Sequence, residues 1–103
     1  MTEDLKKEAY RKKKEAQLQA IEARIEELKA KAEKAGAEAQ LTYAEQLEDL
    51  KSQREVAEDK LEELGAASEA AWEELTEGID SAFDELQASI SEATDRIEKT
   101  LSA

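Results

Sequence analysis

The amino-acid sequence predicts an all-α protein of the coiled-coil type. Its 103 residues include no proline and only three glycines, so the residues that usually separate strands are scarce. Charged residues make up 41% of the chain and aromatic residues 4%, and the strong helix formers alanine, glutamate, lysine, leucine and glutamine dominate. High charge is also typical of disordered chains. The spacing of the apolar residues therefore decides between helix and disorder.

Apolar residues recur at steps of three and four along three stretches, the spacing that places side chains on one face of a helix. Charged and small polar residues fill the positions between them, so each stretch predicts an amphipathic helix. Arg54 interrupts the second stretch, where its long stem is expected to lie along the apolar seam. The predicted interaction seam comprises Leu18, Ile21, Ile25, Leu28, Tyr43, Leu47, Leu50, Leu61, Leu64, Trp72, Leu75, Ile79, Phe83, Leu86, Ile90, Ile97 and Leu101.

Two glycines divide this pattern. Gly65 precedes Ser68; a glycine can adopt the left-handed conformation that ends a helix, and a serine can cap the free N–H groups of the next one. A turn between helices is therefore predicted near Gly65. Gly36 has no capping residue beside it, although the apolar stripe changes phase between Ala35 and Leu47, which can mark a hinge.

These signals leave two architectures for a single domain over residues 1–103. We favour a long antiparallel helical hairpin, because nothing caps a turn at Gly36. One helix over about residues 3–64 would turn near Gly65, and a second over about 68–101 would fold back along it. The long arm would measure about 90 Å at 1.5 Å per residue, and its exposed first half would need a partner chain. The alternative is a three-helix bundle with turns near both Gly36 and Gly65.

Charge is distributed unevenly along the chain. The net charge of −12 divides into +2 over residues 1–34, −6 over 35–64 and −8 over 65–103. This asymmetry favours a pairing in which the basic start lies near the third, acidic stretch. Because the remainder of the chain is acidic, we expect no nucleic-acid binding. The basic patch near the start comprises Lys6, Lys7, Arg11, Lys12, Lys13 and Lys14.

The composition lacks the usual catalytic residues. With no histidine and no cysteine, imidazole bases, thiolate nucleophiles and the common zinc ligands are missing. Carboxylates one helical turn apart, such as Asp80 and Asp84, lie opposite the apolar stripe, where we expect a solvated acidic face. We therefore predict no enzymatic activity, no catalytic residue and no cofactor or metal.

Part of the sequence resembles a known group of proteins. The resemblance covers about residues 8–90, including the run KAKAEKAGAEAQLTY and the element AWEELTEG around Trp72. These residues are similar to those of small, uncharacterised bacterial coiled-coil proteins, and a related cyanobacterial group is labelled stress-response. The resemblance implies a helical protein associated with stress, and it supplies no catalytic residues.

The expected function is that of a non-enzymatic structural or interaction protein. It would act by self-association or by binding a partner helix, with a second copy or another helical protein as its partner. One alternative is reversible binding of the third stretch to a lipid surface. Another is a solvating, stress-protective helix former, which the mean hydropathy of −0.80 suggests.

Two absences in the sequence bear on where the protein acts. No stretch approaches the roughly 20 apolar residues that a membrane span needs. The first thirty residues carry no apolar signal segment. A cytoplasmic protein with no transmembrane segment is predicted.

Overall fold

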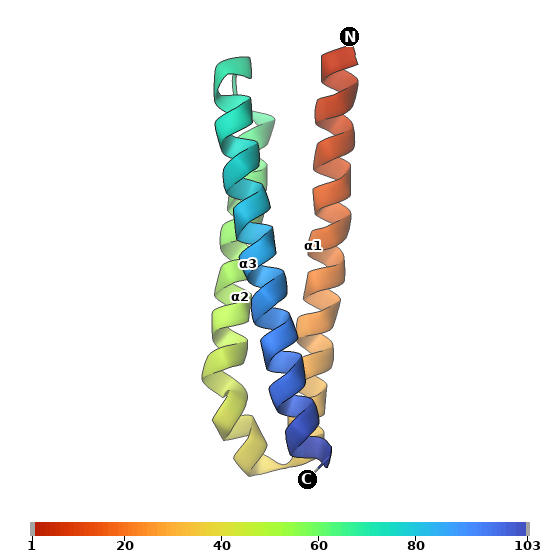
Figure 1. Ribbon diagram of the computed structural model, residues 1–103, viewed down its shortest axis with the longest axis vertical. Helices are drawn as coiled ribbons and strands as arrows, with labels where there is room; N and C mark the ends of the chain where they lie inside the picture. The colour runs from red at the N-terminus through yellow and green to blue at the C-terminus, as the bar shows by residue number, and fades with distance from the viewer. Residues whose placement is uncertain (1, 103) are drawn as a thin grey trace.

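The computed structural model describes the backbone of residues 2–102 and the side chains of residues 5–102. Helix α1 spans Thr2–Ala35, α2 spans Ala37–Gly65 and α3 spans Glu69–Ser102. Over residues 2–102 the chain contains no strand, and the all-α prediction is confirmed. The helices lie side by side, with α1 and α3 running in one direction and α2 in the other (Figure 1). The longest extent is 54 Å, close to the roughly 51 Å that 34 helical residues span.

The helix predicted over residues 3–64 is interrupted at Gly36. This residue alone separates α1 from α2, with φ 109° and ψ 176°, a conformation essentially open only to glycine. Its N–H donates to the Glu33 carbonyl (3.2 Å), and its own carbonyl accepts from the Gln40 N–H (3.1 Å). No side chain among the described residues caps the start of α2. The backbone of a single glycine therefore makes this turn.

The turn predicted near Gly65 is confirmed, but one detail of its geometry differs. Gly65 is the last residue of α2, and the only positive φ within residues 2–102 belongs to Gly36. The left-handed conformation predicted for Gly65 is therefore wrong. Ala66 ends the helix instead, with φ −104° and its N–H bonded to the Glu63 carbonyl at 3.1 Å. The predicted cap is confirmed, since Ser68 Oγ accepts from the Ala71 N–H at 3.4 Å.

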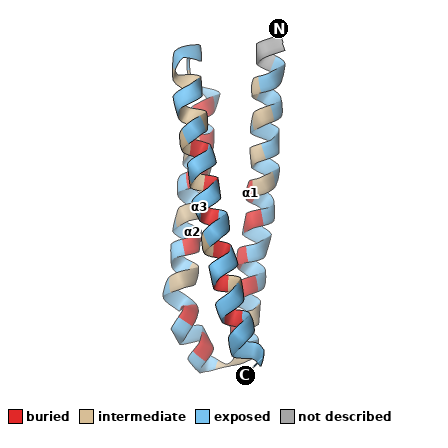
Figure 2. Cartoon of the chain, in the orientation of Figure 1, coloured by how far each residue is buried: buried red, intermediate tan, exposed pale blue. Residues whose placement is uncertain are grey.

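All three helices contribute to one apolar core. Buried positions recur along each of them (Figure 2), because residues three and four apart share a helix face. The largest side chains that are essentially inaccessible to solvent are Phe83, Leu28, Leu50, Ile79, Leu86 and Ile97. Small residues lie among them, with Ala57 and Ala93 fully buried, and their size lets the helices approach closely. The core therefore combines large side chains with a few alanines.

Candidate interaction site

Most residues of the predicted seam are used inside the chain. The structure buries Leu18, Ile21, Ile25, Leu28, Tyr43, Leu50, Leu61, Leu64, Ile79, Phe83, Leu86, Ile90 and Ile97. Leu47, Trp72 and Leu75 are half-buried against this core, and Leu101 is 44% exposed. The apolar stripe of α1, which a hairpin leaves open, is covered here by α2 and α3. Little of the seam is therefore left for a partner chain.

A polar cluster joins the first part of α1 to α3. Lys14 Nζ lies 2.9 Å from Asp80 Oδ1, and the Tyr10 hydroxyl donates to the same oxygen at 2.8 Å. The Lys14 side chain is only 12% exposed, whereas that of Asp80 is 54% exposed. Asp80 was expected on a solvated acidic face, and it is exposed there, but its pairing with Lys14 was not predicted. It is the anionic partner of a nearly buried ammonium group.

Aromatic rings surround this ion pair. The Lys14 ammonium lies 4.9 Å from the centre of the Phe83 ring. Tyr10 meets Trp72 edge to face, with 5.7 Å between ring centres, and Lys7 Nζ lies 5.3 Å from the Trp72 ring. A cation is attracted to the face of an aromatic ring. The cluster therefore holds α1 against α3 by charge as well as by apolar contact.

The basic patch is divided between the cluster and the surface. Lys14 is nearly buried and Lys7 is half-buried, and both face α3, while Lys6, Lys12 and Lys13 are exposed. Lys12 and Arg11 form ion pairs within α1 itself. Lys12 lies 3.3 Å from Glu8, and Arg11 lies 3.9 Å from Glu15. The patch thus lies beside the acidic third helix, and part of its charge is balanced within the chain.

The cluster shifts the pKa values of two of its members. The hydrogen bond from Lys14 lowers the pKa of Asp80 below its ordinary value of 3.8; burial opposes this shift, and Tyr10 adds to it. Burial, together with the hydrogen bond to Asp80 and its negative charge, raises the pKa of Tyr10 above 10.0. Tyr10 therefore stays a hydrogen-bond donor up to strongly alkaline pH, and its contribution to stability declines as pH rises beyond 10.0.

The lowered pKa of Asp80 predicts a pH-dependent contribution to stability. The carboxylate stabilises the fold above pH 3.8, and this contribution is lost as pH falls through the lower folded-state pKa. Asp80→Asn is expected to reduce the unfolding free energy at pH about 6, and this reduction should shrink as the pH falls below 3.8. Urea denaturation of both proteins across this range measures it. A reduction that stayed constant with pH would contradict the assignment, and Asp84→Asn, at an exposed position one turn along α3, is the matched control.

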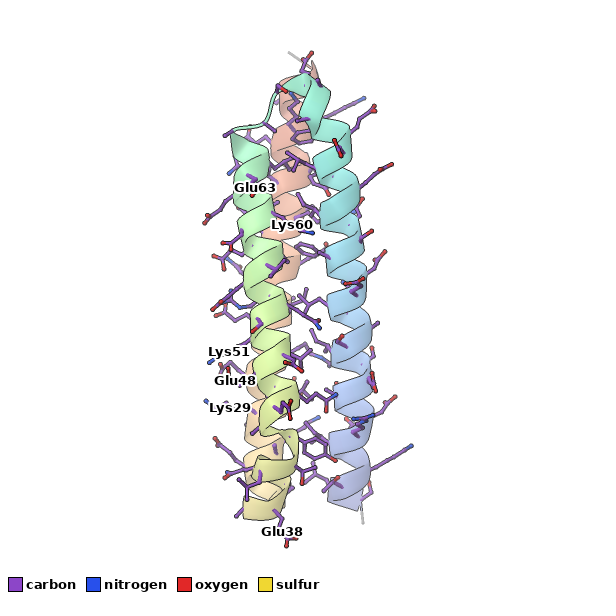
Figure 3. All side chains as sticks on the ribbon, turned by 90° about the vertical axis from the view of Figure 1, so that its left-hand side faces the viewer. Lys29, Glu38, Glu48, Lys51, Lys60 and Glu63 are labelled. Atoms are coloured by element: carbon purple, nitrogen blue, oxygen red, sulfur yellow. The ribbon has the colours of Figure 1, made fainter. Side chains whose placement is uncertain are left out.

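A groove with an apolar floor lies between α1 and α2. Its floor is formed by Ile25 and Ala32 on α1 and by Ala44 and Leu47 on α2. Charged residues of both signs line its edges, and Lys29, Glu48 and Lys51 project from the same edge of the bundle (Figure 3). Sequence periodicity did not reveal this groove, because its residues share no single helix face. It exists only where α1 and α2 lie side by side.

Two arginines of the long predicted arm have defined partners. The Arg54 side chain is 18% exposed, and its guanidinium lies 2.9 Å from the Glu58 carboxylate. Arg24 of α1 donates to the Thr94 hydroxyl of α3 at 3.4 Å. A few large apolar side chains remain exposed, namely Leu5, Leu41 and Val56. They lie off the three stripes, and isolated apolar residues on a surface are ordinary.

The described residues present no metal site or membrane span. No group of three or more aspartates and glutamates within them is placed to hold a metal ion. None of the helices is both long enough and apolar enough to cross a membrane. No protein-family model, curated protein or solved structure matches this chain. The resemblance to small bacterial coiled-coil proteins, and the association with stress that it implies, stay predictions.

Proposed function

We propose that this chain is a non-enzymatic interaction protein that rests as a closed three-helix bundle and self-associates through the α1/α2 groove. The supporting observation is the groove itself, where the exposed Ala44 and the half-buried Leu47 lie over the buried Ile25 and Ala32, while most of the seam is covered within the chain. When two copies cover such a surface together, its apolar area is removed from water, and this favours association.

The charges around the groove favour a second copy as the partner. A two-fold dimer brings the same patch onto itself, so the patch needs charges of both signs. The groove has Lys29 and Lys51 together with three glutamates, a local charge of −1 in a chain of −12. Elsewhere the acidic surface of α3 would repel an identical surface. Exposed ion pairs each contribute about 0–1 kcal/mol, so they orient the contact and the apolar floor supplies the affinity.

A substitution within the groove tests this proposal. Ala44 is exposed in the groove, and Ala23 is exposed on α1 outside it. We expect the wild-type protein to approach dimer mass at high concentration, Ala44→Glu to dimerise much more weakly because a charge enters the apolar floor, and Ala23→Glu to behave as wild type. Light scattering gives the mass, and small-angle scattering of the monomer separates a bundle of 54 Å from a hairpin of about 90 Å.

The proposal fails if the wild-type protein is monomeric at all concentrations or if Ala44→Glu dimerises equally well. Binding of α3 to lipid finds less support, because its apolar face is occupied. Ile79, Phe83 and Leu86 on that face are at most 2% exposed, so α3 would have to leave the core before it met a membrane.

A further inference from the structure

The connection between α1 and α2 consists of one residue. Gly36 holds a conformation that other residues rarely adopt, and no described side chain caps the helix that follows it. Strong helix formers flank it in the run AEKAGAEAQ. The turn after α2 is different, since three residues and the Ser68 cap define it. Local preference around Gly36 is thus for continued helix, and the packing of α1 keeps the turn closed.

Short hinges of this kind favour the exchange of an element between two copies. We propose that two copies of this chain exchange α1. Gly36 joins the helix, residues 2–65 become one helix of about 96 Å, and α1 of each copy packs against α2 and α3 of the other. This route does not depend on the α1/α2 groove as a docking surface, and it goes beyond the self-association proposed above.

Exchange preserves the contacts that hold α1 in place. The ion pairs Lys14–Asp80 and Lys31–Glu98 both join α1 to α3, and each would re-form with the partner's identical residue. The apolar stripe of α1 would likewise be covered by the second copy. Only the turn itself changes, so the equilibrium depends mainly on the conformation of Gly36 and on protein concentration.

The residues around Gly36 are also compatible with the continuous helix of the exchanged dimer. Ala32 and Ala39 are both buried and are seven residues apart, so they lie on the same side of a continuous helix. In the exchanged dimer the two long helices run past each other at this point. Alanine side chains there allow the two backbones to approach closely.

Gly36→Ala is the first test. Alanine is strained in the closed turn, where φ is +109°, and it is the best residue for a continuous helix. We expect the dimer dissociation constant, measured by light scattering, to fall at least tenfold. Gly78→Ala is the matched control. It lies within α3, where an added Cβ meets no described atom within 4 Å, and it should leave the dissociation constant unchanged.

Cross-linking separates exchange from docking at the groove. The chain has no cysteine, so Arg24→Cys with Thr94→Cys introduces one pair where α1 meets α3. A short bifunctional maleimide links this pair within one chain in a closed bundle or a groove dimer, and between chains in the exchanged dimer. When this cysteine pair is combined with Gly36→Ala, we expect covalent dimers on a denaturing gel. A monomeric Gly36→Ala protein, or a dimer with only intrachain links, overturns the proposal.

A second hinge variant covers the case in which Gly36→Ala fails to fold. Two glycines inserted after Gly36 lengthen the turn, which favours the closed monomer. The Arg24→Cys/Thr94→Cys protein with its natural hinge is expected to form interchain links at high concentration. The two inserted glycines should abolish these links. Interchain links that persist equally with the longer turn contradict exchange. Ala44→Glu added to Gly36→Ala should leave the exchanged dimer intact, which keeps this result separate from the groove proposal.

Discussion

Replacing Phe83 with alanine is expected to lower the free energy of unfolding by about 3–5 kcal/mol. The Phe83 side chain is 2% exposed and is the largest of the fully buried residues, so its loss leaves a cavity that the rigid helices cannot close. The substitution also removes the ring beside the Lys14 ammonium. The free energy of unfolding of small domains is about 5–15 kcal/mol, so this substitution removes a large part of it.

Urea denaturation followed by circular dichroism measures this change. Leu101→Ala is the control on the same helix, because Leu101 is 44% exposed and its truncation should cost less than about 1 kcal/mol. A loss below about 1 kcal/mol for Phe83→Ala would mean that α3 does not place this ring in the core. The packing of α3 against the other two helices, as described above, would then be wrong.

Replacing Asp80 with alanine is expected to cost about 1–2 kcal/mol, and Lys14→Met in the same protein should recover most of it. The substitution leaves the ammonium of Lys14, whose side chain is 12% exposed, without its carboxylate. Breaking a fully buried pair costs about 3–5 kcal/mol, and the exposure of Asp80 to solvent reduces that figure here. Methionine keeps the length of Lys14 and removes the charge.

The four proteins of this double-mutant cycle isolate the coupling between the two side chains. Tyr10→Phe, which removes the hydroxyl that contacts Asp80 and the Thr76 carbonyl, should cost about 1 kcal/mol. Equal losses in Asp80→Ala and in the double variant would show that the ammonium needs no partner. The pair also fixes how α1 is aligned along α3, because one oxygen of Asp80 serves both Lys14 and Tyr10.

The sequence revealed the helices and most of the buried residues. Leu18, Leu50 and Ile90 are buried where the stripes place them, because the period of a helix decides which side chains share a face. The Ser68 cap was also visible, since the interaction is local and depends on the side chain. The open position of the α1/α2 groove was not, because its floor combines residues of two helices.

The conformations of Gly65 and Gly36 differ from those that their neighbouring residues indicate. Gly65 has a capping residue close behind it and was expected to be left-handed, yet it stays helical beside Arg11, whose guanidinium carbon would lie 3.6 Å from an added Cβ. Gly36 has no such residue, yet it reverses the chain. A turn made by backbone alone leaves no side-chain signal, and only the gain from packing α1 against α2 and α3 favours it.

The type of each element is encoded locally: the amphipathic helices, their apolar faces, and a chain without histidine or cysteine. Those properties follow from local preference and periodicity, which act within a few turns. The tertiary structure alone decided that the chain bends at Gly36, that Lys14 meets Asp80 across 66 positions, and which groove stays open. These depend on contacts between residues distant in sequence, whose free energy outweighs the local preference for a continuous helix.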